Sequence, residues 1–268
     1  MPNTAWLAEF THYWPTYWPE RISMSRSNPV DGSRNPSSRW FEWAGGADGG
    51  FVRWYNKESE KHENVSLPFT FLLLDELSTV KGWHEPSESG IFSNEVRDLR
   101  QDVLIVRSFK GGELASGLYS TIRDRVIAVG GHYSASLYVA YKDGDELKIG
   151  NLQLKGAASS AWMEFKRAAG SKKNTEGKAV RAYFVDAVQI TGYEQAKKGG
   201  TTYRVPQFAL KETSTSTNLQ AVALDAELQA FLSEYLKRPK AEAAVTQDEP
   251  APAQPASKFD DMEDNIPF

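Results

Sequence analysis

Alternating apolar and polar residues mark several segments of the chain as β-strands. Along residues 51–57 the alternation turns Val52 toward a buried face and turns Arg53, Tyr55 and Lys57 toward the opposite face, because successive side chains of a strand point to opposite sides of a sheet. A strand with an apolar face and an aromatic, cationic face is typical of a nucleic-acid-binding sheet. An ordinary solvated strand face is the alternative interpretation.

The same reading extends over most of the chain. A strand is expected to begin near Trp40, and Asp143-Gly144 is a hairpin signal between two alternating segments. Further strands are predicted at residues 65–74, 91–96, 102–110, 132–142, 147–155, 180–193 and 201–210. Apolar residues spaced three or four apart predict helices over residues 114–125, 157–169 and 219–236. The pattern by itself therefore indicates a mainly β protein with a few helices, built as a mixed barrel or sandwich.

Charge divides the chain into two unequal parts. The 268 residues carry a net charge of −4, but residues 239–268 hold two lysines against seven acidic residues. The rest of the chain then has 29 basic and 28 acidic residues. From Pro239 onward Ala, Pro, Glu and Gln dominate without periodicity, which predicts a disordered tether. We expect three parts: an aromatic and basic N-terminal arm (1–38), a folded domain (39–238), and a linker with an acidic tail (239–268).

The last nine residues predict a peptide that a partner protein recognises. Four carboxylates precede an apolar Ile-Pro-Phe end, a combination that suits a basic surface with a pocket for the terminal Phe and its carboxylate. The residues expected to bind a partner are Asp260, Asp261, Glu263, Asp264, Ile266, Pro267 and Phe268. The alternative is a solvated acidic tail.

This ending resembles the acidic tip of bacterial and phage single-stranded-DNA-binding proteins, and the chain's length and order look more like the phage versions. The resemblance implies an oligonucleotide-binding (OB) fold, here a five-stranded barrel with an extra hairpin and a C-terminal helix. It also implies sequence-independent binding and protection of single-stranded DNA during replication, recombination or repair. The tip would recruit replication and repair proteins and would compete with DNA for the protein's own basic groove.

Side chains that could hold a single strand are aromatic rings beside cations on the predicted strands, since bases stack on rings and phosphates pair with Lys and Arg. The candidates are Arg53, Tyr55, Lys57, Arg107, Phe109, Lys110, Tyr138, Lys142, Arg181 and Tyr183. The aromatic residues of the N-terminal arm could also stack bases, support self-association, or cover the domain's own core.

Signatures of an enzyme are thin. The four histidines lie far apart along the chain, and Gly177-Lys178 is followed by Ala179 instead of the Ser or Thr of a phosphate-binding loop. The absence of cysteine excludes disulfides and thiolate metal sites. We expect no catalysis, no cofactor, no metal and no membrane partner, and a cytoplasmic location, that of the bacterial host if a phage encodes the chain. Two alternatives remain open: an adaptor or recombination mediator without a DNA groove, and a nucleic-acid-processing enzyme with a scattered acidic site.

Overall fold

The computed structural model of the chain describes residues 35–173 and 178–237. Two of the expected parts therefore lie wholly or mostly outside the described residues. Of the N-terminal arm only residues 35–38 are described, and the linker and acidic tail at 239–268 are not described at all.

The described residues form mainly β-structure with a few helices, as the alternation predicts. The strands are β1 (Arg39–Ala44), β2 (Phe51–Asn56), β3 (Lys61–Val65), β4 (Phe69–His84), β5 (Ser89–Ser93), β6 (Leu104–Ser108), β7 (Gly112–Gly117), β8 (Gly131–Asp143), β9 (Glu146–Lys155), β10 (Ser171–Lys173), β11 (Ala179–Arg181), β12 (Ala187–Lys198) and β13 (Thr201–Lys211). The helices are α3 (Tyr119–Ala128), α4 (Ala157–Ala168) and α5 (Thr215–Tyr235), with 3₁₀ turns η2 (Glu85–Ser87) and η3 (Ala182–Phe184).

Eleven strands form one sheet, and β10 and β11 pair separately. The strand order is β3-β2-β1-β9-β8-β4-β5-β6-β7, and β12 joins β4 and carries β13 on its other edge. Strand β4 is long enough to pair with two strands along one edge: residues 69–71 pair with β12 and residues 81–84 pair with β5. Strand β8 pairs along the opposite edge of β4. The expected five-stranded OB barrel is not seen, because the sheet has eleven strands and is not closed.

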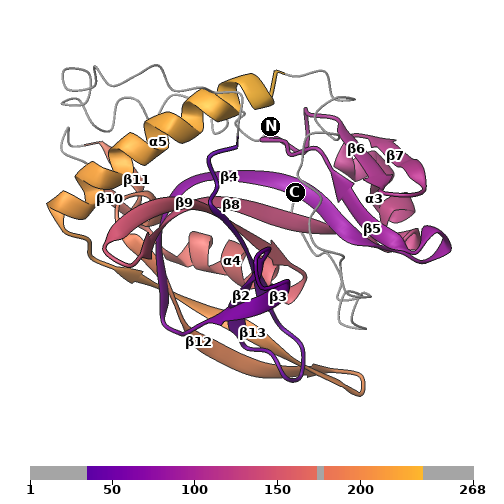
Figure 1. Cartoon of the computed structure of the whole chain (residues 1–268), viewed down its shortest axis with the longest axis horizontal. Coiled ribbons are helices and arrows are strands. Elements are labelled where there is room, and N and C mark those ends of the chain that lie inside the picture. Colours follow the sequence, from indigo (N-terminus) through magenta and orange to yellow (C-terminus); the bar gives the residue numbers. More distant parts are fainter. Residues whose placement is uncertain (1–34, 174–177, 238–268) are drawn as a thin grey trace.

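The two faces of this sheet differ in what covers them. We call the face that carries Val52, Leu137 and Leu152 the inner face, because these side chains belong to the main core. Helix α4 lies against the inner face, where Trp162 is fully buried, and β12 and β13 pass on the other side of that helix (Figure 1). The opposite, outer face is covered in part by α5, whose Leu228 packs in a second core.

The β12–β13 hairpin, at one edge of the sheet, bends back toward the β1–β2 hairpin. The backbone N–H of Arg204 on β13 donates to the carbonyl of Gly45 in the β1–β2 turn at 2.8 Å. The indole Nε1 of Trp43 donates to the carbonyl of Arg204 at 2.9 Å. These contacts hold the β12–β13 hairpin beside the β1–β2 hairpin without adding a further strand pairing.

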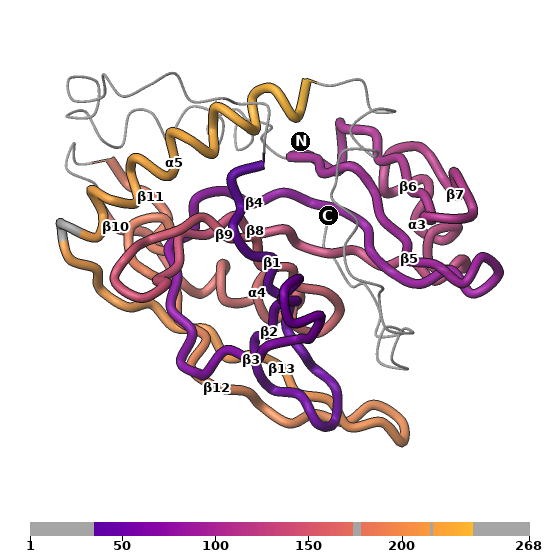
Figure 2. Tube along the Cα trace, viewed as in Figure 1, coloured from indigo at the N-terminus to yellow at the C-terminus, as the bar shows by residue number. Residues whose placement is uncertain are grey.

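Two of the sequence predictions need correction. The segment that starts at Leu114 was expected to be helical, but residues 112–117 form β7 and pair with β6, and helix α3 begins only at Tyr119. The strand expected over residues 180–193 is interrupted by the 3₁₀ turn η3, and its first residues belong to β11, which pairs with β10 in a small hairpin. Figure 2 shows that this small hairpin lies at the opposite end of the molecule from β6, β7 and α3.

Candidate nucleic-acid interface

Two of the expected binding residues lie together on the outer face of β1, β2 and β3. Arg53 pairs across the strands with Glu42 and Asn64, and its Nε donates to Glu42 Oε1 at 2.7 Å. Tyr55 lies opposite His62, and the two rings meet edge to face with centroids 5.4 Å apart. Burial and the neighbouring Arg53 cation lower the pKa of His62, so its ring is neutral at pH 7.

Trp40 extends this surface along β1. Its ring is 38% exposed, and it shares the outer face with Glu42, two residues further along the same strand. We call Trp40, Arg53, Tyr55 and His62 the β1–β3 patch. Lys57 is exposed just after β2 ends, at the edge of this patch.

A second group of expected residues lies on β5, β6 and the turn that follows. The ring of Phe109 stacks on that of Phe92 with centroids 4.5 Å apart and remains 42% exposed. Arg107 pairs with Phe92 across the strands, and its NH2 lies 3.9 Å from Glu113 Oε2. Lys110 is exposed beside them. We call Phe92, Arg107, Phe109 and Lys110 the β5–β6 patch.

Strand register places both patches on the same face of one continuous sheet. Arg107 pairs with Phe92, Phe92 with Lys81, and Lys81 with His132 on β8. On the same side of β8, Ser136 pairs with Gln153, Gln153 with Glu42, and Glu42 with Arg53. Residues that pair directly across neighbouring strands share a face, so the outer face carries an aromatic and cationic patch toward each end.

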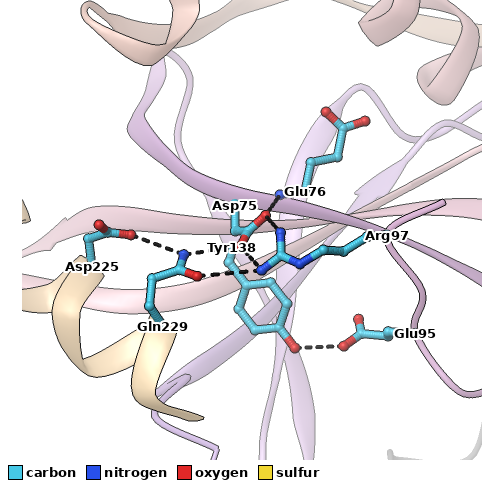
Figure 3. Close-up of polar contacts among 7 residues, drawn as sticks. All are labelled: Asp75, Glu76, Glu95, Arg97, Tyr138, Asp225 and Gln229. Atoms are coloured by element: carbon cyan, nitrogen blue, oxygen red, sulfur yellow. Dashed lines mark hydrogen bonds and ion pairs between the residues drawn. The ribbon is translucent and has the colours of Figure 1, made fainter. Parts of the chain in front are cut away.

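The strip between the patches is polar and buried. The carboxylate of Glu95 accepts a hydrogen bond from the hydroxyl of Ser136 and another, at 2.6 Å, from that of Tyr138; Figure 3 shows the bond with Tyr138. The amide of Asn151 donates to Ser136 Oγ at 2.7 Å. Burial raises the pKa of Glu95, and burial followed by the nearby Glu95 charge raises the pKa of Tyr138.

This arrangement corrects the expectation for Tyr138. The alternation places Tyr138 on the outer face as predicted, but its side chain is fully buried, packed in the second core with Leu228 of α5 and hydrogen-bonded to Glu95. Its ring has no free face on which a base could stack.

A second polar cluster fastens α5 to the same face. The guanidinium of Arg97 donates to both carboxylate oxygens of Asp75, at 2.8 and 2.7 Å. Gln229 on α5 donates to Asp75 Oδ2 at 3.0 Å and to Asp225 Oδ1 at 3.3 Å (Figure 3). Because Asp75 and Asp225 are both buried, these bonds replace the water that the carboxylates lose when the helix docks.

The remaining expected residues are not brought to either patch. Tyr183 is buried beside Trp162 at 6.1 Å between ring centroids, and burial raises its pKa to about 12. It is therefore also unavailable for stacking. Arg181 is half-buried on β11, at the far end of the molecule from the β5–β6 patch (Figure 1). Lys142 is exposed beyond Ala140, which packs under α5, so the docked helix separates it from both patches.

Sequence reasoning missed three rings, of which Trp40 and Tyr193 are exposed and Phe92 is buried against Phe109. Trp40 carried a usable signal, since the alternation along Arg39–Ala44 sets it on the polar side with Glu42. Phe92 and Tyr193 carried none, because their neighbours in the sheet are known only once the strands are paired.

Comparison with family models, with curated proteins and with solved structures finds no match to this chain. Among residues 35–173 and 178–237, no three His, Asp or Glu side chains are grouped as ligands of a metal ion. In the same part of the chain, no helix has both the length and the apolar character that crossing a bilayer requires.

Proposed function

We propose that this protein binds single-stranded DNA without sequence preference, through the outer face of its sheet. The observation that carries the proposal is the presence of two patches on that one face, each combining aromatic rings with cations. Rings accept any base, because every base has a flat face, and stacking contributes about 1–3 kcal/mol per base. Arginine and lysine add an affinity for phosphates that falls as salt rises.

The spacing of the patches indicates how a strand would lie. Six strand-to-strand steps separate β2 from β6 in the sheet order, which at about 4.8 Å per step is a path of roughly 29 Å. A strand that touched both patches would pass beside α5 and over the buried polar strip. We further propose that the bent sheet, whose ends meet at Arg204 and Gly45, serves as an open counterpart of the OB barrel that the tail resemblance implies.

The acidic end enters the proposal as a recruiting peptide. Residues 260–268 lie outside the described residues, so the support is their sequence alone: carboxylates followed by Ile266, Pro267 and Phe268. The tip would bind replication and repair proteins and would compete weakly with DNA for the cationic patches. Deleting residues 260–268 should leave DNA affinity unchanged or raise it, and should abolish partner recruitment. Markedly weaker DNA binding after the deletion would contradict this role.

Fluorescence anisotropy of a labelled oligo(dT), titrated with the full chain at several salt concentrations, tests the proposal. We expect binding whose affinity falls with salt, with a slope near −0.7 for each phosphate contacted. An oligomer of mixed sequence should bind equally well. Absence of binding would favour an adaptor without a DNA surface, and shortening of the oligomer when Mg²⁺ is added would favour an enzyme. Either result overturns the proposal.

A matched pair of variants locates the surface. Phe109 and Ile127 are both exposed apolar side chains, at 42% and 37%. Phe109 lies on the outer face, whereas Ile127 belongs to α3, which packs against the inner face. Phe109→Ala should weaken oligo(dT) binding by roughly 5- to 150-fold if a base stacks there, and Ile127→Ala should not change it. Equal affinities for the two variants would remove the β5–β6 patch from the proposal.

A further inference from the structure

The β12–β13 hairpin projects beyond the body of the protein as an arm. Gly192 pairs with Gln207 and the ladder continues without interruption to Lys198 and Thr201. At the tip, a Cβ built on either Gly199 or Gly200 would meet nothing within 4 Å, so the turn stands clear of the body. Figure 1 shows the hairpin extending away from α4 and past β2 and β3.

Arg204 fixes the arm at the point where it leaves the body. Its backbone bonds to Gly45 in the β1–β2 turn and to the indole of Trp43 on β1, and its guanidinium donates to the carbonyl of Gly49 and lies 4.8 Å from the ring centroid of Tyr193. The ring of Tyr193 packs against Gly50, where an added Cβ would come within 2.6 Å of it. An isolated two-stranded hairpin is marginally stable in water. The arm therefore depends on this anchoring for a defined direction.

The chemistry of the arm suits the backbone of a single strand. Lys197 and Lys198 are exposed next to the Gly-Gly turn, and consecutive strand residues face opposite ways, so the tip presents a cation on each side. The glycines leave the turn free of side chains, which lets a backbone approach closely. The ring of Tyr193 is 42% exposed at the base of the arm.

We propose that the arm is a second contact for the single strand, in which Lys197 and Lys198 bind backbone phosphates beyond the edge of the sheet. This inference rests on the proposed single-strand binding. It adds a phosphate-binding hairpin, which the resemblance of the acidic tail to single-stranded-DNA-binding proteins does not imply. Three residues, 201–203, separate Arg204 from the turn, so Gly200 is four residue steps, or about 13 Å, beyond the anchor. That reach extends the binding surface past the β1–β3 patch.

The test compares two double variants of the full chain in the oligo(dT) titration. Lys197→Ala with Lys198→Ala removes the two cations of the arm, and Lys173→Ala with Lys178→Ala removes two exposed lysines of the β10–β11 hairpin at the far end of the molecule. We expect the arm variant to bind more weakly at low salt, with a salt slope shallower by about 1.4, from about 0.7 for each lost phosphate contact. The control variant should match the wild-type chain in affinity and in slope.

The outcomes separate this inference from the function on which it rests. If the wild-type chain does not bind the oligomer, the proposed function fails and the arm has no ligand. If the wild-type chain binds and the two double variants behave alike, the function stands and the arm is not a contact. Both variants change only exposed side chains, and equal urea-unfolding midpoints for the three proteins would show that a weaker titration reflects lost contacts.

Discussion

The hydroxyl of Tyr138 is predicted to stabilise the fold through a buried carboxylate. The change Tyr138→Phe removes a single oxygen from a side chain with no solvent exposure, so no water can replace the lost donor. That oxygen lies 2.6 Å from Glu95 Oε2, and a hydrogen bond to a charged group contributes about 1.5–3 kcal/mol. We expect the free energy of unfolding to fall by up to that amount, and to fall more at pH 8 than at pH 4.5, because a larger fraction of Glu95 is ionised at the higher pH.

The loss should depend on pH in a definite direction. Burial raises the pKa of Glu95 above its ordinary 4.5, so the folded protein keeps this proton over a pH range in which the unfolded chain has released it. The contribution of Glu95 to stability is therefore largest below pH 4.5 and decreases as pH rises through that range. Removing the Tyr138 donor, which favours the ionised form, should raise the pKa further. At pH 4.5, below the raised pKa, the protonated carboxyl predominates in the fold, and the loss should fall toward the about 0.5–1.5 kcal/mol of a neutral hydrogen bond.

Urea unfolding at pH 8 and pH 4.5 measures both quantities, and Tyr141→Phe is the matched control. Tyr141 lies on the same strand but on the inner face, and its hydroxyl is bonded to the neutral Ser38 hydroxyl at 2.9 Å. The control should lose about 0.5–1.5 kcal/mol at both pH values. If the two variants lose the same free energy at pH 8, or if the Tyr138→Phe loss does not shrink at pH 4.5, the Tyr138 hydroxyl does not donate to an ionised Glu95 carboxylate.

Two further changes test the packing of the fold by urea unfolding. Gly50→Ala should cost about 2–4 kcal/mol of unfolding free energy, because φ is 91° and the new methyl group would lie 2.6 Å from the Tyr193 ring. The control Gly112→Ala, with φ of 73° and nothing within 4 Å, should cost only about 1 kcal/mol. Equal losses for the two variants would show that the Tyr193 ring does not pack tightly on Gly50. Trp162→Ala should cost about 3–5 kcal/mol, because the fully buried indole packs against several rings of the inner core, and a loss below about 1 kcal/mol would show that α4 does not fill that core.

The alternation of single strands was predicted well because it is a local property. Val52 is buried and Tyr55 is half-exposed on opposite sides of β2, as the pattern requires. The turn at Asp143-Gly144 joins β8 to β9 as an antiparallel hairpin. In both cases the signal and the structure that it predicts lie within a few residues of each other.

Helix α3 shows where a local pattern misleads. Apolar residues at 114, 118, 122 and 126 have helical spacing, but Leu114 lies on β7 and the helix begins at Tyr119. Gly112 adopts a φ of 73° at the start of β7, directly after the turn that reverses the chain, and the residues of β7 pair with β6. A spacing of four over so short a stretch does not distinguish a strand residue from a helical one. Here the turn after β6 places Leu114 on a strand.

Tyr138 shows why the solvent exposure of a side chain is harder to predict than the face of the sheet on which it lies. Its neighbours Ser136 and Ala140 share its face, so the strand pattern was correct. The amphipathic pattern of residues 219–236 also predicted α5, but nothing in it specifies that Leu228 docks over Tyr138. Which part of a face is covered depends on contacts between residues far apart in the sequence.

The common face of the two patches depends on one irregularity in β4. Phe71 and Leu73 point to the inner face, whereas after the register shift between Leu73 and Asp75 the inner residues are even-numbered, Val80 among them. An uninterrupted strand would turn Lys81, which pairs with Phe92, toward the inner face, and the β5–β6 patch would lie on the side opposite to Arg53. The run from Phe71 to Leu74 is continuously apolar, so the sequence has no alternation there to reveal the extra residue. The bulge is thus the local feature that places both patches on one face, as the proposed binding of a single DNA strand requires, and only the pairing of β4 with β8 reveals it.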